Sequence, residues 1–142
     1  MSNSVSVLRF SVLAVIAAAL ACAQSSAPPR PVTTLTVKGE ITADEIKETI
    51  LAHNQAAVTK YVLWDLGQAT AKAIQSSEIG SIVHATQEFT KSRKGGKTAI
   101  VASSDINFGL SRMYDILHEL SHSDVPHMTF HSKEEALKWL TE

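Results

Sequence analysis

The sequence predicts an α/β fold in which strands and helices alternate along one domain. Short runs of β-branched and apolar residues, typical of strands, recur between segments whose apolar residues repeat at helical spacing. Residues that cap helix N-termini stand just before those segments. The 142 residues suit one domain with a core of its own. From residue 32 onward we therefore expect the order β-α-β-α-β-α-β-α.

Two strands and two helices are expected in the first half of this domain. Residues 32–37 read as a half-buried strand, and Thr42 with Glu45 forms a capping box that begins a helix. Residues 61–64 are continuously apolar, as in a strand covered on both faces. A second helix begins near residues 76–77. Its buried stripe is expected to hold Ile79, Ile82, Val83 and Phe89.

The next strand and helix follow a basic turn. Residues 98–102 form the strand, and a residue among 103–105 caps the helix. Four side chains of this helix are expected to face the core: Leu110, Met113, Leu117 and Leu120.

A short strand and a helix end the domain. In the strand we expect Met128 and Phe130 to point inward, which turns His127 and His131 to solvent. A second capping box, formed by Ser132 and Glu135, begins the last helix.

Charge balance argues against one class of partner. The chain has 14 acidic and 13 basic residues. Such a chain has no broad positive field of the kind that gathers nucleic acid through its phosphates. We therefore expect no nucleic-acid partner.

The N-terminus reads as an export signal. An apolar run follows Arg9 and covers residues 10–23, which is shorter than the roughly 20 residues of a membrane span. Small residues end the run. We expect residues 1–23 to be a signal peptide or lipoprotein signal, residues 24–31 a linker, and residues 32–142 the domain.

Two processing routes stay open, and a third reading is an uncleaved anchor or a buried helix. A signal peptidase could cut beside the small residues, or Cys22 could be the lipid-attachment site of a bacterial lipoprotein. Because Cys22 is the only cysteine, the domain has no internal disulfide. The expected location is outside the cytoplasm, periplasmic or anchored to a membrane through the N-terminus.

Several segments resemble one family. Residues 62–66, residues 99–114 and the ending at residues 130–140 are similar to SpoIIAA-like STAS domains, especially the STAS/SEC14-like branch of small bacterial proteins. The resemblance covers about residues 35–140. It implies a STAS-like mixed β-sheet with packed helices and no enzyme activity. It also implies a role in binding a protein partner or in holding an apolar or lipid-like ligand.

The same resemblance draws attention to Ser76 and Ser77. In the anti-sigma-factor antagonists of this superfamily, an Asp-Ser-Ser-Gly segment enters the second helix, and its first serine is phosphorylated. Here Gln75 replaces the aspartate and Glu78 the glycine. Each serine is thus a possible phospho-acceptor, but we expect both to serve as helix caps, whose hydroxyls accept from free backbone N–H groups.

A competing motif is His118-Glu119-Leu120-Ser121-His122. It matches H-E-x-x-H, in which two histidines one helical turn apart bind zinc and the glutamate acts as general base. Helical spacing, however, places His118 and His122 on the polar face, and no well-placed third ligand follows them. We therefore expect no metal.

The function expected from the sequence is that of a non-catalytic STAS-like binding module outside the cytoplasm, without a cofactor. Its expected ligand is a lipid or another apolar small molecule. One alternative is regulatory binding of a protein partner, as in anti-sigma-factor antagonists. The other is a small zinc hydrolase built on the histidine motif.

Overall fold

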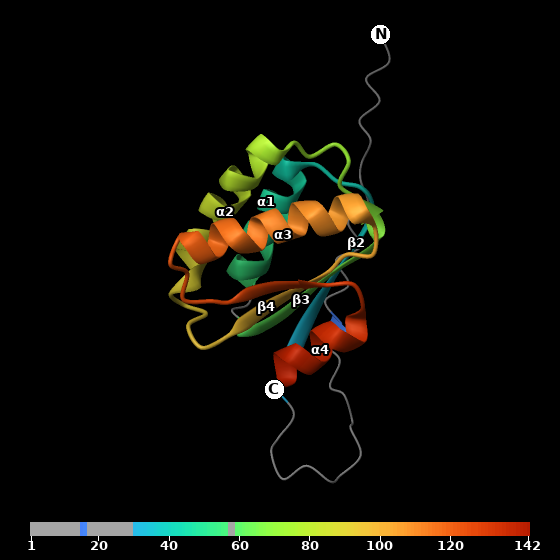
Figure 1. Cartoon of the computed structure of the whole chain (residues 1–142). Coiled ribbons are helices and arrows are strands. Elements are labelled where there is room, and N and C mark those ends of the chain that lie inside the picture. Colours follow the sequence, from blue (N-terminus) through green and yellow to red (C-terminus); the bar gives the residue numbers. More distant parts are fainter. Residues whose placement is uncertain (1–14, 17–29, 57–58) are drawn as a thin grey trace.

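In a computed structural model of the whole chain, residues 15–16, 30–56 and 59–142 are described (Figure 1). Of the expected signal at residues 1–23, only Val15 and Ile16 are among these residues, and Cys22 lies outside them. The strands are β1 (Val15–Ile16), β2 (Val32–Glu40), β3 (Tyr61–Thr70), β4 (Lys97–Val101) and β5 (His127–Phe130). The helices are α1 (Ala43–Ala56), α2 (Ser76–Thr90), α3 (Asp105–Leu120) and α4 (Lys133–Thr141).

The strands lie in the sheet in the order in which they occur in the chain. Strands β2 to β5 are parallel neighbours, and only the short β1 is antiparallel to β2. The crossovers between successive parallel strands all run on the same side of the sheet, so α1, α2 and α3 lie on one face (Figure 1). Helix α4 covers the other face (Figure 1). The predicted α/β order is confirmed, and the sheet is mixed only through β1.

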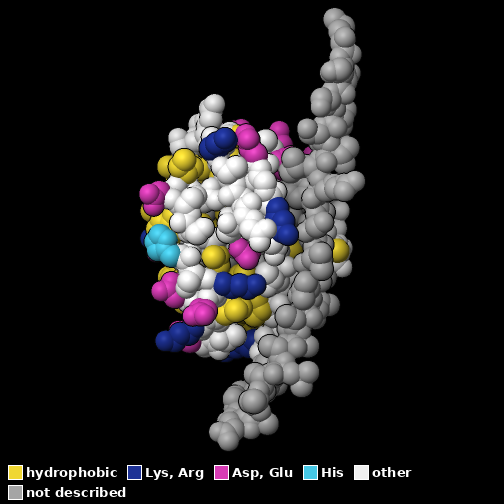
Figure 2. All heavy atoms as spheres, turned by 90° about the vertical axis from the view of Figure 1, so that its right-hand side faces the viewer, with side chains coloured by type: hydrophobic (Ala, Val, Ile, Leu, Met, Phe, Trp, Pro, Cys, Tyr) yellow, Lys and Arg dark blue, Asp and Glu magenta, His cyan; other side chains and the backbone are white. Residues whose placement is uncertain are grey.

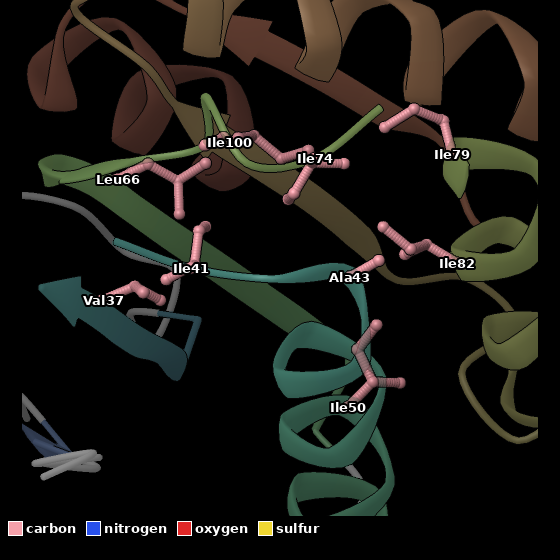
Figure 3. Packing of buried hydrophobic residues seen from close by; sticks show 10 residues of the cluster. Val37, Ile41, Ala43, Ile50, Leu66, Ile74, Ile79, Ile82 and Ile100 are labelled. Atoms are coloured by element: carbon pink, nitrogen blue, oxygen red, sulfur yellow. The ribbon is translucent and has the colours of Figure 1, made fainter. Parts of the chain in front are cut away.

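Each face of the sheet has its own core. Under α1 to α3, isoleucines from the helices and the sheet extend into one shared layer (Figure 3). Under α4, Leu63, Ala99 and Leu140 are fully buried. Alternate residues of β3 and β4 enter opposite cores, which is the two-residue period of a strand covered on both faces.

Three of the expected caps are confirmed by hydrogen bonds. In the capping box of α1, the Thr42 N–H donates to Glu45 Oε2 at 2.8 Å and the Glu45 N–H donates to Thr42 Oγ1 at 3.3 Å. The Ser104 hydroxyl accepts from the Asn107 N–H, and the Ser132 hydroxyl from the Glu135 N–H. These bonds satisfy backbone donors that the first turn of a helix leaves free.

The expected inward face of α3 is wrong for two of its four residues. Leu110 and Leu117 do pack against the core under α1 to α3. Leu120 is 69% exposed and Met113 is 38% exposed. Four polar side chains are buried on this helix: Asn107, Ser111, Asp115 and His118. A prediction that places only apolar residues inside fails here, because several of these polar side chains form hydrogen bonds that allow them to be buried. Asp115 Oδ2, for example, accepts from the Thr129 hydroxyl at 2.7 Å.

The expected orientation of β5 is also wrong in part. Phe130 does pack inward, beside Trp139 of α4. Met128 is 38% exposed, whereas Thr129 is buried and His127 faces the core under α3. The strand therefore turns its histidine inward and its methionine toward solvent. His131, just beyond β5, is exposed and stacks on Phe108 at 3.9 Å between ring centroids.

The surface is mixed in charge. On the part of the face that the described residues form in Figure 2, acidic and basic side chains are interspersed. This pattern agrees with the near balance of charges in the sequence. Among the described residues, no helix is both long enough and apolar enough to cross a membrane.

Candidate functional site

A cavity of about 100 Å³ lies between the sheet and helices α1, α2 and α3. Its walls are mostly apolar because the inward faces of the three helices meet the inward face of the sheet there. The main apolar contributors are Ile50, Ile79 and Ile82 from the helices and Trp64, Leu66 and Ile100 from the strands. Figure 3 shows several of these side chains converging on one layer.

The lining of the cavity runs along the strands. It follows β3 from Val62 to Leu66, about 13 Å at roughly 3.3 Å per residue. Near Leu66, Asn107 ties α3 to the loop after β3, since its Oδ1 accepts from the Ala71 N–H at 2.9 Å. Near the amino ends of the strands the lining becomes polar. We call this region, lined by His53, Thr86, Arg93, Thr98, Tyr114, His118 and His127, the polar end.

Two histidines stack at the polar end. The rings of His118 and His127 lie 3.8 Å apart between centroids, at an interplanar angle of 28°. His118 Nε2 lies 2.7 Å from Thr86 Oγ1. Tyr114 Oη lies 3.4 Å from His127 Nε2. Helices α2 and α3 and the start of β5 thus meet through side-chain contacts.

Hydrogen-bond partners fix which nitrogens carry protons. The Thr86 hydroxyl donates to the Val83 carbonyl at 2.7 Å, so it can only accept from His118 Nε2–H. His127 Nδ1 lies 2.8 Å from the Val125 carbonyl and must donate to it. His127 Nε2 is then free to accept from Tyr114. Both rings are neutral in this arrangement.

Burial keeps these groups uncharged. It lowers the pKa of His118 to about 4 and that of His127 well below its ordinary value. The charge of Arg93 lowers both further. Burial also raises the pKa of Tyr114, so its hydroxyl stays protonated and able to donate.

Arg93 lies in the turn between α2 and β4, beside the stacked histidines. Its Nε donates to the Thr59 carbonyl at 2.9 Å. Its Nη2 donates to the carbonyls of Lys60 at 3.2 Å and Lys97 at 3.3 Å. Gly96 allows this turn to press against the Lys60 backbone, where a Cβ would clash. The guanidinium is therefore held by backbone carbonyls at the amino ends of β3 and β4.

Arg93 is a half-buried cation without a carboxylate partner among the described residues. Burial lowers its pKa, but a guanidinium remains charged at neutral pH. Its charge also lowers the pKa of His53, after the larger effect of burial. The polar end is thus electropositive through a single residue.

The zinc-site motif is not assembled. His118 is 1% exposed, so its expected place on the polar face is wrong. Glu119 and His122 are exposed, and His122 lies beyond the end of α3 with a φ of 56°. The described residues contain no group of three side chains that could hold a metal ion. The motif is split because the helix ends between its two histidines.

The serines are also placed differently from the expectation. Ser76 and Ser77 are exposed and occupy the first turn of α2, so their expected role as helix caps is wrong. Gln75 is the N-cap, and its N–H donates to Glu78 Oε2 at 2.8 Å. Glu78, at the third helical position, thus supplies the side-chain acceptor for a backbone N–H at the start of α2, and this is the kind of bond that was expected of the serines. Whether either serine is a phospho-acceptor stays a prediction.

Sequence reasoning overlooked Thr86 and Arg93. Thr86 continues the stripe of Ile79 and Ile82 at helical spacing, so periodicity already placed it toward the core. Arg93 lies in the turn beyond the end of α2, where helical spacing gives no signal. His118 also had a signal, because Asn107, Ser111, Asp115 and His118 recur at spacings of four, four and three. A polar stripe at this period is as regular as an apolar one.

Comparisons of the chain with protein-family models, curated proteins and solved structures found no match. The resemblance to STAS domains therefore stays a prediction. What the fold and cavity define is a class: an α/β protein with an apolar cavity that has one polar, electropositive end.

Proposed function

We propose that this chain is a non-catalytic binding protein that holds a small apolar ligand between its sheet and helices α1 to α3. The observation that carries the proposal is the cavity, whose walls are isoleucine-rich and most of whose polar groups lie at one end. Ligand sites commonly combine apolar walls with a few polar groups that fix orientation.

The volume of the cavity bears on both its role and its ligand. Left unfilled, about 100 Å³ costs roughly 2 kcal/mol at about 24 cal/mol per Å³. That is a large part of a typical stability of about 5–15 kcal/mol. An engineered apolar cavity of about 150 Å³ holds benzene, whereas drug-sized ligands need about 300 Å³ or more. The ligand is therefore small. A lipid-like ligand, as the family resemblance suggests, must have a short chain to fit.

Xenon and benzene test the cavity with no assumption about a head group. We expect xenon to give a saturable change in ¹²⁹Xe chemical shift and benzene to raise the Tm, because both bind only the folded state. Ile82→Phe, which places a larger side chain on the cavity wall, should abolish both effects.

Ile116→Phe is the matched control. Ile116 is 49% exposed on α3, and the same substitution there should leave both effects intact. If neither probe binds the wild-type protein, the cavity does not accept ligands and the proposed function is wrong. If Ile82→Phe binds the probes as well as the wild-type protein does, the probes bind outside this cavity.

The place of action is the second part of the proposal, and it rests on the apolar run at residues 10–23. We expect export and removal of this run, so that the mature chain begins at Cys22 or Gln24. Intact mass of protein from the membrane and periplasmic fractions of a bacterial host tests this. A mature chain that retains Met1 would contradict it.

A further inference from the structure

We propose that the ligand is a short-chain aliphatic monocarboxylate, whose carboxylate pairs with Arg93 at the polar end while its tail lies along the apolar walls. This inference rests on the proposed function, because it names the chemical class of ligand for the same cavity.

Charge is the first argument. Arg93 is the one lysine or arginine among the described residues that line the cavity. In the described part of the chain, ion pairs join Lys47 to Asp44 and Arg112 to Asp115. Neither pair includes Arg93. Cations in apolar surroundings are normally paired. An anionic ligand would supply the missing partner.

Hydrogen-bonding capacity is the second argument. The three bonds of Arg93 to carbonyls use Nε and Nη2, and no described residue accepts from Nη1. The Thr98 hydroxyl, on a side chain that is 2% exposed, also has no partner among the described residues. A carboxylate offers two oxygens and so can accept from both groups.

The charge of the ligand follows from the neighbours of Arg93. His53, His118 and His127 share the polar end, and the pKa of each is lowered by burial. They stay neutral at pH 7 and add no positive charge. A dianion such as phosphate would leave one negative charge uncompensated in an apolar cavity, which is costly. The site therefore suits a single negative charge.

The size and shape of the cavity define the tail. A volume of about 100 Å³, lined along four residue steps of β3, suits a short chain better than a long acyl chain. Long-chain acids would require the helices to separate from the sheet. Pentanoate is the probe that we choose.

The test on the wild-type protein compares three compounds by isothermal titration calorimetry at pH 7. Pentanoate carries tail and charge, pentan-1-ol carries only the tail, and acetate has the charge with almost no tail. We expect pentanoate to bind at least tenfold more tightly than either of the others. Equal affinity for pentanoate and pentan-1-ol would overturn the pairing with Arg93. If acetate binds as tightly as pentanoate, or dodecanoate binds more tightly than pentanoate, the inference of a short aliphatic tail is wrong.

Arg93→Met removes the guanidinium and keeps an apolar stem. We expect it to abolish the preference for pentanoate over pentan-1-ol while pentan-1-ol binds as before. Lys91→Met is the matched control, because it removes a charge from an exposed position two residues away and should leave the preference intact. If Arg93→Met does not fold, the comparison of compounds on the wild-type protein still decides.

The two proposals fail in different ways. If xenon and benzene do not bind, the cavity is not a ligand site and both proposals fall. If they bind but pentanoate is no better than pentan-1-ol, the proposed function stands and the inference about the carboxylate is wrong.

Discussion

Acidification from pH 7 to pH 4 is expected to lower the free energy of unfolding by about 3 kcal/mol through His118 alone. Its pKa is about 4 in the folded protein against an ordinary value of 6.5. The unfolded chain therefore binds a proton more readily, at about 1.4 kcal/mol per pKa unit. This contribution is fully present above pH 6.5 and is lost as the pH falls toward 4. Urea denaturation at intervals of half a pH unit measures it.

Neighbouring groups modify the acid response in both directions. His127 has a pKa well below its ordinary value and adds to the loss at low pH. Burial raises the pKa of Asp115, so its protonation acts in the opposite sense and stabilises the fold at low pH. Arg93 stays charged throughout and disfavours a second positive charge on either imidazole.

Two variants assign the acid response to His118. His118→Gln does not titrate but keeps an amide that can donate to Thr86, so we expect a clearly shallower dependence of stability on pH. His122→Asn is the control, because His122 is exposed and asparagine tolerates its positive φ. Its pH dependence should match that of the wild type. An unchanged slope in His118→Gln would contradict our account of the buried imidazole.

Local signals in the sequence predicted the order of elements well. Capping residues such as Thr42, Ser104 and Ser132 act over three or four positions, so their partners can be found without knowledge of the fold. The continuous apolar character of residues 61–64 also identified a strand covered on both faces. Such signals come from residues that are close together in the sequence, so they can be recognised without the three-dimensional structure.

The candidate site was hidden because its partners are distant in sequence. His118 is buried because Thr86 lies within reach, 32 positions earlier. Asp115 is buried because Thr129 supplies a hydroxyl from β5. An average hydropathy pattern assigns such residues to the surface, since it contains no information on hydrogen-bond partners that are distant in sequence. The same reasoning misplaced the hydrophobic residues Met113 and Leu120.

The geometry of the turn explains why Arg93 escaped attention. Its basic neighbours Lys91, Lys94 and Lys97 made residues 91–97 read as a solvated turn. Lys91 and Lys94 are exposed, whereas Arg93 turns back toward the cavity and donates to three carbonyls. Only the approach of this turn to the strand ends distinguishes the residue, and that approach depends on Gly96.

Gly96→Ala is expected to destabilise the protein by about 1–3 kcal/mol or more, the range seen when atoms are forced into well-packed regions. A Cβ at this position would clash with the Lys60 carbonyl oxygen and lie 2.7 Å from the carbonyl carbon. Both atoms belong to the backbone of the residue that precedes β3. The same carbonyl accepts from the Lys97 N–H at 2.9 Å, so neither segment can move without loss of that bond.

Gly80→Ala is the matched control for Gly96→Ala, and its effect should have the opposite sign. Gly80 is exposed in α2, and nothing lies within 4 Å of the position that a Cβ would take. Replacing a glycine in a helix by alanine should stabilise the fold by about 0.5–1 kcal/mol. Urea denaturation of both variants and the wild type measures the contrast. A neutral result for Gly96→Ala would mean that the turn carrying Arg93 is not held against Lys60 as described.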